Sequence, residues 1–186
     1  MKLENLQYDI TTPAAKKEIL RFLIRFTLLF LAWHITYGQF LSPAGVIDRP
    51  LTNFISLSVV KCINSLNLSP FDLTWIEDHI NHRNFLIQNN NKVFSIFYSC
   101  DGMNLMFTYV SILLLLPYPA KRKIVFSLGG IATIIAVNII RCAALYLIYV
   151  YHNSTFNFSH HYLFTLLIDL LIFYGWLLFI KKKKIA

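Results

Sequence analysis

Cys100, Arg141 and the adjacent pair His160 and His161 have side chains that could together make and break an acyl bond. A cysteine is a nucleophile only as its thiolate, and a neighbouring imidazole can take the thiol proton and later return it to a leaving group. A fixed arginine can lower the pKa of the thiol or stabilise the oxyanion of a tetrahedral intermediate. These three residue types therefore suit acyl transfer, provided that the fold brings them together.

Arg141 is the most unusual of these residues, because it interrupts the apolar run IATIIAVNIIRCAALYLIYVY at 131–151, with Asn138 one helical turn before it. An ionisable side chain inside such a run must find a partner or a wet cavity, and it is a functional-site hypothesis by default. One alternative is structural: Arg141 pairs with Asp169 and holds two helices together. The histidine pair could likewise be an interfacial anchor without chemistry, and each cysteine a small packing residue.

Long apolar runs place the whole chain, residues 1–186, in the class of integral membrane proteins with a single domain. Hydrophobic residues make up 56% of the sequence, the mean hydropathy is +0.55, and charged residues make up only 14%, against about 25% in a soluble domain. The net charge of +8 comes from lysines and arginines at the ends of the apolar runs, which favours membrane orientation over nucleic-acid binding. The three cysteines have no spacing typical of a zinc site or a disulfide framework.

Four segments are apolar and near the roughly 20 residues that a helix needs to cross a bilayer. They lie at about residues 19–41, 94–116, 124–150 and 161–180. The shorter run at 51–68, interrupted by Lys61, is interpreted as an amphipathic helix on the membrane surface or a re-entrant segment, with a fifth span as the alternative. The polar remainder of the region 42–93 is expected to be loop. The predicted fold is therefore an all-α polytopic bundle of about four spans plus one interfacial or re-entrant helix.

Basic residues near the ends of the spans predict the orientation, since they are retained on the cytoplasmic side. With four spans, all the basic clusters fall on one side: Lys16, Lys17, Arg21 and Arg25, the KRK sequence at 121–123, and the KKKK sequence at 181–184. The chain is therefore expected in the plasma (inner) membrane with both termini in the cytoplasm. The region 42–93 and the loop at 152–160 then face outward.

This orientation brings the reactive residues to the outer half of one bundle. Cys100 lies near the outer end of the second span, and the histidine pair begins the fourth span at the outer surface. Arg141 lies roughly 9 residues, or about 13 Å, below the outer end of the third span. Asp169 is expected at a similar depth, which is the basis of the expected ion pair. The predicted site therefore faces outward.

The EDHINH sequence at 77–82 could suggest a metal site. Its two histidines are three residues apart, and the favoured interpretation is that Glu77, Asp78, His79 and His82 are polar residues exposed to solvent. No metal, cofactor or nucleic acid is therefore expected, and the partner that the composition predicts is the lipid bilayer. A small transporter is disfavoured, because no two halves of the chain resemble repeats of one another.

Three short motifs resemble those of the exosortase/archaeosortase family of membrane transpeptidases, in the order in which the family carries them. CDG at 100–102 resembles a Cys-Ser/Thr-Gly motif that opens a membrane helix, NIIR at 138–141 matches an Asn-x-x-Arg motif in the next helix, and SHHYLF at 159–164 resembles the start of the last helix. The resemblance covers residues 94–180. The small size and the HHYLF sequence are most similar to the short exosortase-like proteins of Bacteroidetes.

The resemblance implies a membrane cysteine protease or transpeptidase that acts on exported proteins. Such an enzyme cleaves a C-terminal sorting signal, formed by a short motif, one membrane helix and a basic tail, and passes the protein to a surface acceptor. The resemblance implies Cys100 as the nucleophile, Arg141 as the stabiliser of the thiolate or the transition state, and His160 as the acid/base. The alternative or supporting residues are His161, Asn138 and Asp169.

Two features depart from the family motifs. Two histidines compete at the start of the last helix, and the family's pattern of an acidic residue after the histidine favours His160, with His161 in the follower position. In addition, Asp101 stands where the first motif has Ser or Thr. A carboxylate beside the thiol would raise the thiol pKa, which works against a nucleophile. An alternative function therefore stands beside the enzyme: a non-catalytic membrane scaffold or assembly factor for the export of surface protein or polysaccharide. In such a scaffold Cys100 would tolerate replacement by Ser or Ala.

Overall fold

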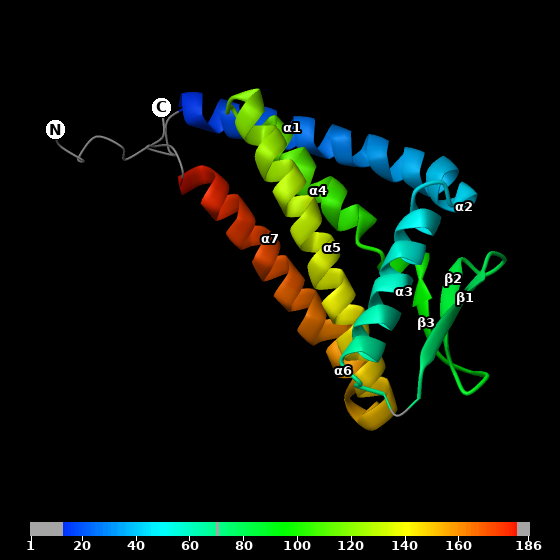
Figure 1. The fold of residues 1–186 in the computed structure, drawn as a ribbon. Coiled ribbons are helices and arrows are strands. Elements are labelled where there is room, and N and C mark those ends of the chain that lie inside the picture. Colours follow the sequence, from blue (N-terminus) through cyan, green and yellow to red (C-terminus); the bar gives the residue numbers. More distant parts are fainter. Residues whose placement is uncertain (1–12, 70, 182–186) are drawn as a thin grey trace.

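The computed structural model describes residues 13–69 and 71–181, and it is a helical membrane bundle with a small antiparallel sheet at one end (Figure 1). Within the described residues, three helical segments are long and apolar enough to cross a membrane: Ala15–Ala44, Ala120–Tyr151 and Phe156–Lys181. They confirm the first, third and fourth predicted spans. A shorter apolar helix, Met103–Leu115, accompanies them.

The helical chain is interrupted once, by three strands that follow its third helix. In chain order the elements are α1 (Pro13–Thr36), a π-helical turn (Tyr37–Leu41), α2 (Ser42–Ala44), α3 (Asp48–Ser65), β1 (Leu73–Asp78), β2 (Arg83–Gln88), β3 (Asn91–Phe97), a 3-10 turn (Tyr98–Cys100), α4 (Met103–Leu115), α5 (Ala120–Tyr151), a 3-10 turn (Asn153–Thr155), α6 (Phe156–Phe158), a π-helical turn (Ser159–Leu163) and α7 (Phe164–Lys181).

The helices α4, α5 and α7 pack together around the Tyr109 ring of α4. A Cβ atom at Gly130 of α5 would overlap this ring, and one at Gly175 of α7 would lie 3.2 Å from it. The two glycines therefore let the ring reach between the two neighbouring helices. The buried cluster around it consists of Met106, Leu113, Ile134, Ile168, Ile172 and Phe179.

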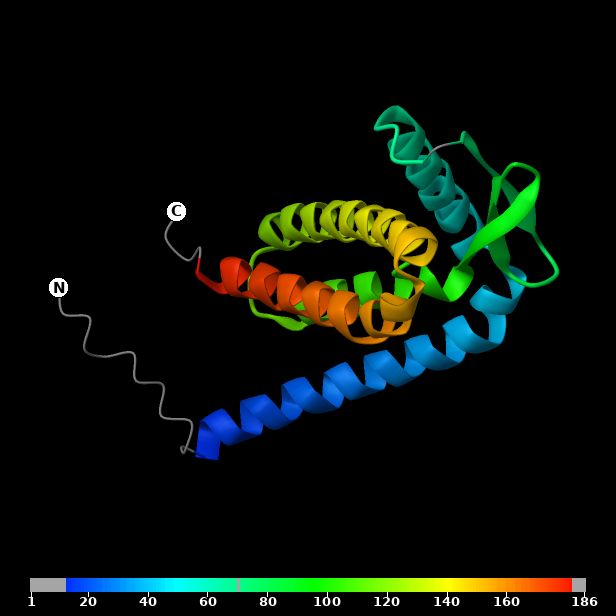
Figure 2. The same cartoon turned by 90° about the horizontal axis from the view of Figure 1, so that it is seen from below.

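The helix α1 lies beside α4 (Figure 2). The Trp33 ring stacks on Phe107 of α4 with 4.1 Å between the ring centroids, and the indole nitrogen donates a 3.2 Å hydrogen bond to the Asn104 side chain. Most of the large apolar side chains of α1 are exposed on the protein. A long helix that is apolar and exposed in this way is suited to contact with lipid.

The second predicted span is wrong in its first part. Residues 91–97 form strand β3, and the chain then makes a 3-10 turn before α4 begins at Met103. Gly102 allows this break, because its φ of 86° lies in the left-handed region that favours glycine. The 13 residues of α4 measure only about 20 Å, less than the roughly 30 Å hydrocarbon core. Cys100 therefore lies in the turn that precedes a short helix instead of inside a full span.

The region after α3, predicted to be loop, is an antiparallel sheet with the strand order β1-β2-β3. Its turns hold His82, Asn89 and Asn90 at φ values of 50°, 49° and 64°. Asparagine is favoured at the left-handed positions of two-residue hairpin turns, so the Asn-rich sequence closes the β2–β3 hairpin. The loop prediction is wrong because it gave weight to these polar turn residues and not to the alternation within the strands.

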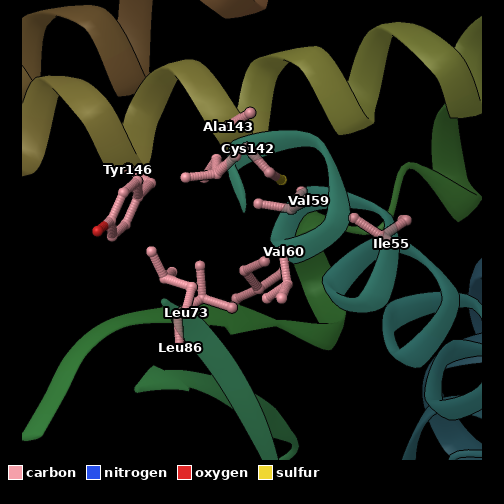
Figure 3. Packing of buried hydrophobic residues seen from close by; sticks show 10 residues of the cluster. Ile55, Val59, Val60, Leu73, Leu86, Cys142, Ala143 and Tyr146 are labelled. Atoms are coloured by element: carbon pink, nitrogen blue, oxygen red, sulfur yellow. The ribbon is translucent and has the colours of Figure 1, made fainter. Parts of the chain in front are cut away.

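The helix α3 covers the sheet and packs against the last turns of α5 (Figure 3). The existence of α3 confirms that the region 51–68 is mostly helical, as predicted. The core between these elements consists of buried side chains: Ile55, Val59, Val60 and Ile63 of α3, Leu73, Leu86 and Ile96 of the strands, and Cys142, Ala143 and Tyr146 of α5. The part of α5 that follows Arg141 is thus packed against α3 and the sheet.

Basic residues gather at the end of the bundle opposite the sheet, where α1 begins, α4 joins α5 and α7 ends (Figure 1). The Arg122 side chain donates a hydrogen bond to the Phe179 carbonyl oxygen and lies over the Phe179 ring, 5.0 Å from its centroid. This contact ties the start of α5 to the end of α7. Residues 182–184 of the last basic cluster lie outside the described residues.

Candidate active site

A cavity of about 390 Å³ lies where β3, the Cys100 turn, α5 and α6 meet. Cys100, Arg141 and His160 all line it, so three of the predicted site residues share one space. The rest of the wall is mostly apolar: Val93, Phe94, Ser95, Ile96, Phe97, Ser99, Cys142, Leu145, Tyr149 and Phe156. A concave, mostly apolar space with a few convergent polar groups is typical of ligand sites.

The turn that carries Cys100 is held by α5. Asn138 is almost fully buried, and its side-chain nitrogen donates a 2.8 Å hydrogen bond to the backbone carbonyl oxygen of Cys100. Gly102 packs against the same helix, since a Cβ atom there would lie 3.5 Å from the Ile134 side chain and 3.9 Å from the Asn138 nitrogen. Asn138 thus fixes the backbone of the cysteine, and the glycine supplies a conformation that other residues adopt with strain.

Arg141 follows Asn138 by one helical turn, which places both residues on the same face of α5. One end of the Asn-x-x-Arg motif therefore holds the Cys100 turn, and the other end lines the cavity beside it. The Nε atom of Arg141 is buried and has no hydrogen-bond partner among the described residues. A buried donor without a partner is unfavourable, so an acceptor that reached this nitrogen would relieve that cost.

The expected ion pair between Arg141 and Asp169 is wrong. No ion pair joins them among the described residues, and the Asp169 side chain is exposed on α7. Asp169 follows His160 by about nine residues, so it lies about 13 Å further along the helical segment than the cavity. The error comes from measuring depth from the end of α5, because the last turns of that helix extend beyond the cavity to pack on α3 and the sheet.

His160 and His161 take different positions in the π-helical turn at Ser159–Leu163, a kind of turn that recurs at functional sites. His160 is partly buried, lines the cavity and stacks on Phe156 with 5.7 Å between the ring centroids. His161 is exposed and meets the His160 ring edge-on, with 4.7 Å between the centroids. Of the two candidates for the acid/base, His160 is thus the one whose ring faces the cavity.

Asp101 does not lie in the cavity wall with the thiol. Its carboxyl group accepts a 2.8 Å hydrogen bond from the Met103 backbone N–H at the start of α4. It is 1% exposed and lies beside the carboxyl group of Asp48, which accepts a 2.8 Å hydrogen bond from the Tyr37 hydroxyl. Burial, opposed by the Met103 hydrogen bond and reinforced by the Asp48 charge, raises the pKa of Asp101 to about 7. The anion expected beside the thiol is therefore a carboxyl group that holds its proton until the pH is near neutral.

The EDHINH group links the sheet to α3. Glu77 accepts a 2.7 Å hydrogen bond from Arg49 of α3 and lies 3.0 Å from a ring nitrogen of His79. Asp78 pairs with Arg83 of β2 at 3.4 Å. In the part of the chain that the structure describes, no three His, Cys, Asp or Glu side chains are placed to hold a metal ion.

The strand residues 93–97 supply a large part of the cavity wall and are not among the site residues predicted from the sequence. A signal was present, because KVFSIF at 92–97 is rich in β-branched and aromatic residues and follows an Asn-rich turn. The apolar run continues without a charge into the turn and only Asp101 interrupts it before α4. Its total length therefore favoured a single spanning helix.

The family model of the transmembrane exosortases (Exosortase_EpsH) matches residues 15–181, which is most of the chain. The matched range contains the whole wall of the cavity. No curated protein matches the chain, and no solved structure matches it.

Proposed function

The chain belongs to the transmembrane exosortase family, and we propose that it is a membrane-embedded cysteine transpeptidase. In this proposal it cleaves a C-terminal sorting signal of exported proteins and transfers the proteins to a surface acceptor. The observation that supports it best is the convergence of Cys100, Arg141 and His160 on one cavity from three distant parts of the sequence. A thiol, a guanidinium and an imidazole are groups that acyl transfer uses.

The first half of the reaction forms a thioester on Cys100. The thiol gives its proton to His160, and the sulfur forms a bond to the carbonyl carbon of the scissile peptide. The carbonyl electron pair moves to the oxygen, and the resulting oxyanion accepts hydrogen bonds from the Arg141 guanidinium. The intermediate then collapses: the C–N bond breaks, and His160 gives the proton to the leaving amine.

The second half of the reaction transfers the acyl group. The nucleophilic group of the acceptor attacks the thioester carbonyl while His160 takes its proton. The C–S bond breaks, the sulfur leaves as the thiolate, and the proton on His160 returns to it. Water in place of the acceptor gives hydrolysis, so exclusion of water by the apolar cavity wall favours transfer.

Helix lengths support a position for this chemistry at one face of the membrane. Arg141 follows Lys123 by about 18 residues, or about 27 Å of helix, which is close to the roughly 30 Å thickness of the hydrocarbon core. The positive-inside rule assigns the basic end of the bundle, and with it both termini, to the cytoplasm. The cavity then opens at the outer face, and Arg141 lies near the boundary of the hydrocarbon, where its charge is less costly than at the bilayer centre.

The proposed substrate is an exported protein that ends in a short motif, one membrane helix and a basic tail. The basic tail holds its helix in the orientation in which the motif reaches the outer face. The motif then meets the cavity at the level of Cys100. The acceptor is a surface molecule with a free nucleophilic group.

Co-expression with such a substrate tests the proposed function. Loss of the C-terminal segment of the substrate reports cleavage, and immunoblotting of the membrane fraction reports the amount of enzyme. We expect Cys100→Ala to leave the enzyme in the membrane and the substrate uncleaved, and hydroxylamine to release the acyl group from the wild-type enzyme as a hydroxamate. Full cleavage by Cys100→Ala would contradict the proposal and favour a scaffold.

A further inference from the structure

The strand β3 is an edge strand, because the sheet has the order β1-β2-β3 and no further strand pairs with β3 in the described part of the chain. Five consecutive residues of this strand, 93–97, line the cavity that contains Cys100. A strand that presents a face to a space contributes every second residue to its wall, since successive side chains point to opposite faces. Five residues in a row therefore place the free edge of β3, with its main-chain groups, against the cavity.

The hydrogen-bond pattern identifies the main-chain groups on this edge. The Tyr98 N–H, directly after β3, donates a 3.0 Å hydrogen bond to the carbonyl oxygen of His82, directly before β2. In an antiparallel pair, every second residue directs its N–H and C=O groups to the partner strand. The N–H and C=O groups of Ser95 and the N–H of Phe97 therefore point away from β2, to the free edge, whereas the Phe97 C=O opens the 3-10 turn Tyr98–Cys100.

This edge lacks the features that keep strands from pairing. Proteins commonly protect a free edge with lysine, proline or a covering segment. The one lysine of β3, Lys92, lies at the start of the strand with its ammonium over the Phe85 ring of β2, and residues 93–97 include no proline and no charged side chain. Within the described ranges, no backbone hydrogen bond from a turn, loop or cap reaches the main chain of Ser95 or the N–H of Phe97. An uncharged and unpaired edge beside a reactive thiol is suited to receive another strand.

We propose that the substrate binds as an extended segment that adds to the free edge of β3 and forms a fourth strand of the sheet. This inference rests on the proposed function and adds to it the way in which the motif is held. Main-chain hydrogen bonds to Ser95 and Phe97 supply affinity, and the apolar wall selects the side chains that point into the cavity. Cys100 follows Phe97 by three residues, so a strand paired with this edge ends beside the thiol.

The direction of the added strand follows from the helices that come after the two strands, α4 after β3 and the membrane helix after the substrate motif. β3 leads through the Cys100 turn into α4, towards the basic end of the bundle. The motif of the proposed substrate likewise leads into a membrane helix that ends in basic residues. Both chains therefore run in the same direction, and the substrate strand is parallel to β3.

A peptide without any motif tests this binding mode, because main-chain pairing does not depend on side chains. The probe is acetyl-tetra-alanine chloromethyl ketone, in which the thiolate displaces chloride and forms a C–S bond, together with analogues that carry one N-methyl group at successive residues. The full chain in lipid nanodiscs is labelled, and mass spectrometry follows the modification of Cys100. We expect N-methylation at alternate residues to slow labelling about tenfold, the effect of one lost hydrogen bond, and methylation at the intervening residues to have little effect.

Two variants of the strand test the same pairing from the side of the protein. Ser95→Pro removes the outward N–H, and proline is tolerated on an edge strand when its nitrogen faces away from the partner strand. Ser95→Ala removes the hydroxyl and keeps the N–H. We expect the probe to label Ser95→Pro about tenfold more slowly than Ser95→Ala, whereas iodoacetamide, which needs no strand pairing, labels both at similar rates.

Strand addition would be overturned by equal sensitivity to N-methylation at every residue, or by equal probe labelling of the two Ser95 variants. A Cys100 thiol that iodoacetamide fails to modify would count against the proposed function, and hydrogen exchange then decides the binding mode. In the Cys100→Ala protein saturated with acetyl-tetra-alanine amide, exchange of the Ser95 and Phe97 amides should slow. Unchanged exchange at both amides would also overturn the proposal.

Discussion

The side-chain nitrogen of Asn138 lies 2.8 Å from the backbone carbonyl oxygen of Cys100. This hydrogen bond joins α5, which carries Arg141, to the turn that carries the thiol. The placement of the Arg141 guanidinium relative to the Cys100 sulfur therefore depends on Asn138, which is not itself one of the residues that line the cavity. The spacing of the Asn-x-x-Arg motif has a physical reason, because one helical turn separates the residue that holds the turn from the residue that lines the cavity.

Asn138→Ala tests this link between α5 and the Cys100 turn. We expect substrate cleavage to fall about tenfold or more, since the turn gains freedom, while the enzyme still inserts because one neutral hydrogen bond contributes only about 1 kcal/mol to stability. Cleavage is measured per amount of enzyme in the membrane. Thr133→Ala on the same helix is the control, since the Thr133 hydroxyl donates its hydrogen bond to the Gly129 carbonyl oxygen of its own helix. Wild-type cleavage by Asn138→Ala would show that the hydrogen bond has no role in the reaction.

Cys142→Ala tests which thiol of the cavity reacts. Cys142 is buried and lines the same cavity as Cys100, whereas Cys62 lies on α3. We expect Cys142→Ala and Cys62→Ala to cleave the substrate and Cys100→Ser to be inactive, because a serine hydroxyl is a much weaker nucleophile than a thiolate. Cys142→Ala should also unfold at a slightly lower temperature, since it leaves a small cavity in the core. An inactive but stable Cys142→Ala would indicate that Cys142, and not Cys100, supplies the reacting thiol.

Separate substitutions of the two adjacent histidines test the assignment of the acid/base. His160→Ala should lose cleavage by about 100-fold or more, the usual contribution of general acid–base catalysis, because the His160 ring faces the cavity. His161→Ala should keep most of the activity, since the His161 ring is exposed and meets the His160 ring, and His161 does not line the cavity. The initial rate of cleavage at a matched enzyme amount is the measurement. The reverse result, with only His161→Ala inactive, would move the assignment by one residue.

The long helices could be predicted from the sequence because local information determines them. α1, α5 and α7 are apolar over roughly 20 residues or more and have basic residues at one end, which leaves few alternatives to a membrane span. The region 91–116 could not be divided correctly, because β3 is defined by pairing with β2, and the start of α4 depends on the backbone conformation of Gly102. Pairing with another segment is a nonlocal property that apolar length does not report.

The site shows the same division between local and nonlocal information. Cys100, Arg141 and His160 could be placed together from the order of the motifs and the alternating direction of the helices. The pairing of Arg141 with Asp169 could not be judged, because it required knowing that α5 continues past the cavity to pack on the sheet. The contact between Asp48 and Asp101 joins elements far apart in the chain, and no sequence pattern indicates it.

The carboxyl group of Asp101 predicts a dependence of stability on pH. Its pKa is raised from 3.8 to about 7 in the folded protein. Below about pH 4 it is protonated in both states, and between about pH 4 and 7 the unfolded chain loses the proton that the folded protein keeps. The free energy of unfolding contributed by this group therefore falls as the pH rises through this window, and it levels off above about pH 7.

Asp101→Asn should remove part of this pH dependence. Thermal unfolding in detergent is measured from about pH 5 to about pH 8, and the midpoint of the wild type relative to that of the variant should fall as the pH rises. The exposed Asp72 offers the control Asp72→Asn, which should follow the wild-type profile. Parallel profiles of Asp101→Asn and the wild type over this range would contradict the raised pKa.

Arg141→Lys tests whether the reaction needs the guanidinium or only a positive charge. Lysine keeps the charge but loses the planar group that can donate two hydrogen bonds to one oxyanion. We expect the variant to insert normally and to cleave the substrate about 100-fold more slowly, the usual effect of removing one oxyanion donor.

Asp169→Asn is the matched comparison, because its side chain is exposed about 13 Å along the helix from the cavity. It should cleave at the wild-type rate. Cleavage by each variant is measured against its abundance in the membrane. An active Arg141→Lys would show that charge is sufficient, and loss of Arg141→Lys alone from the membrane would assign Arg141 a structural role.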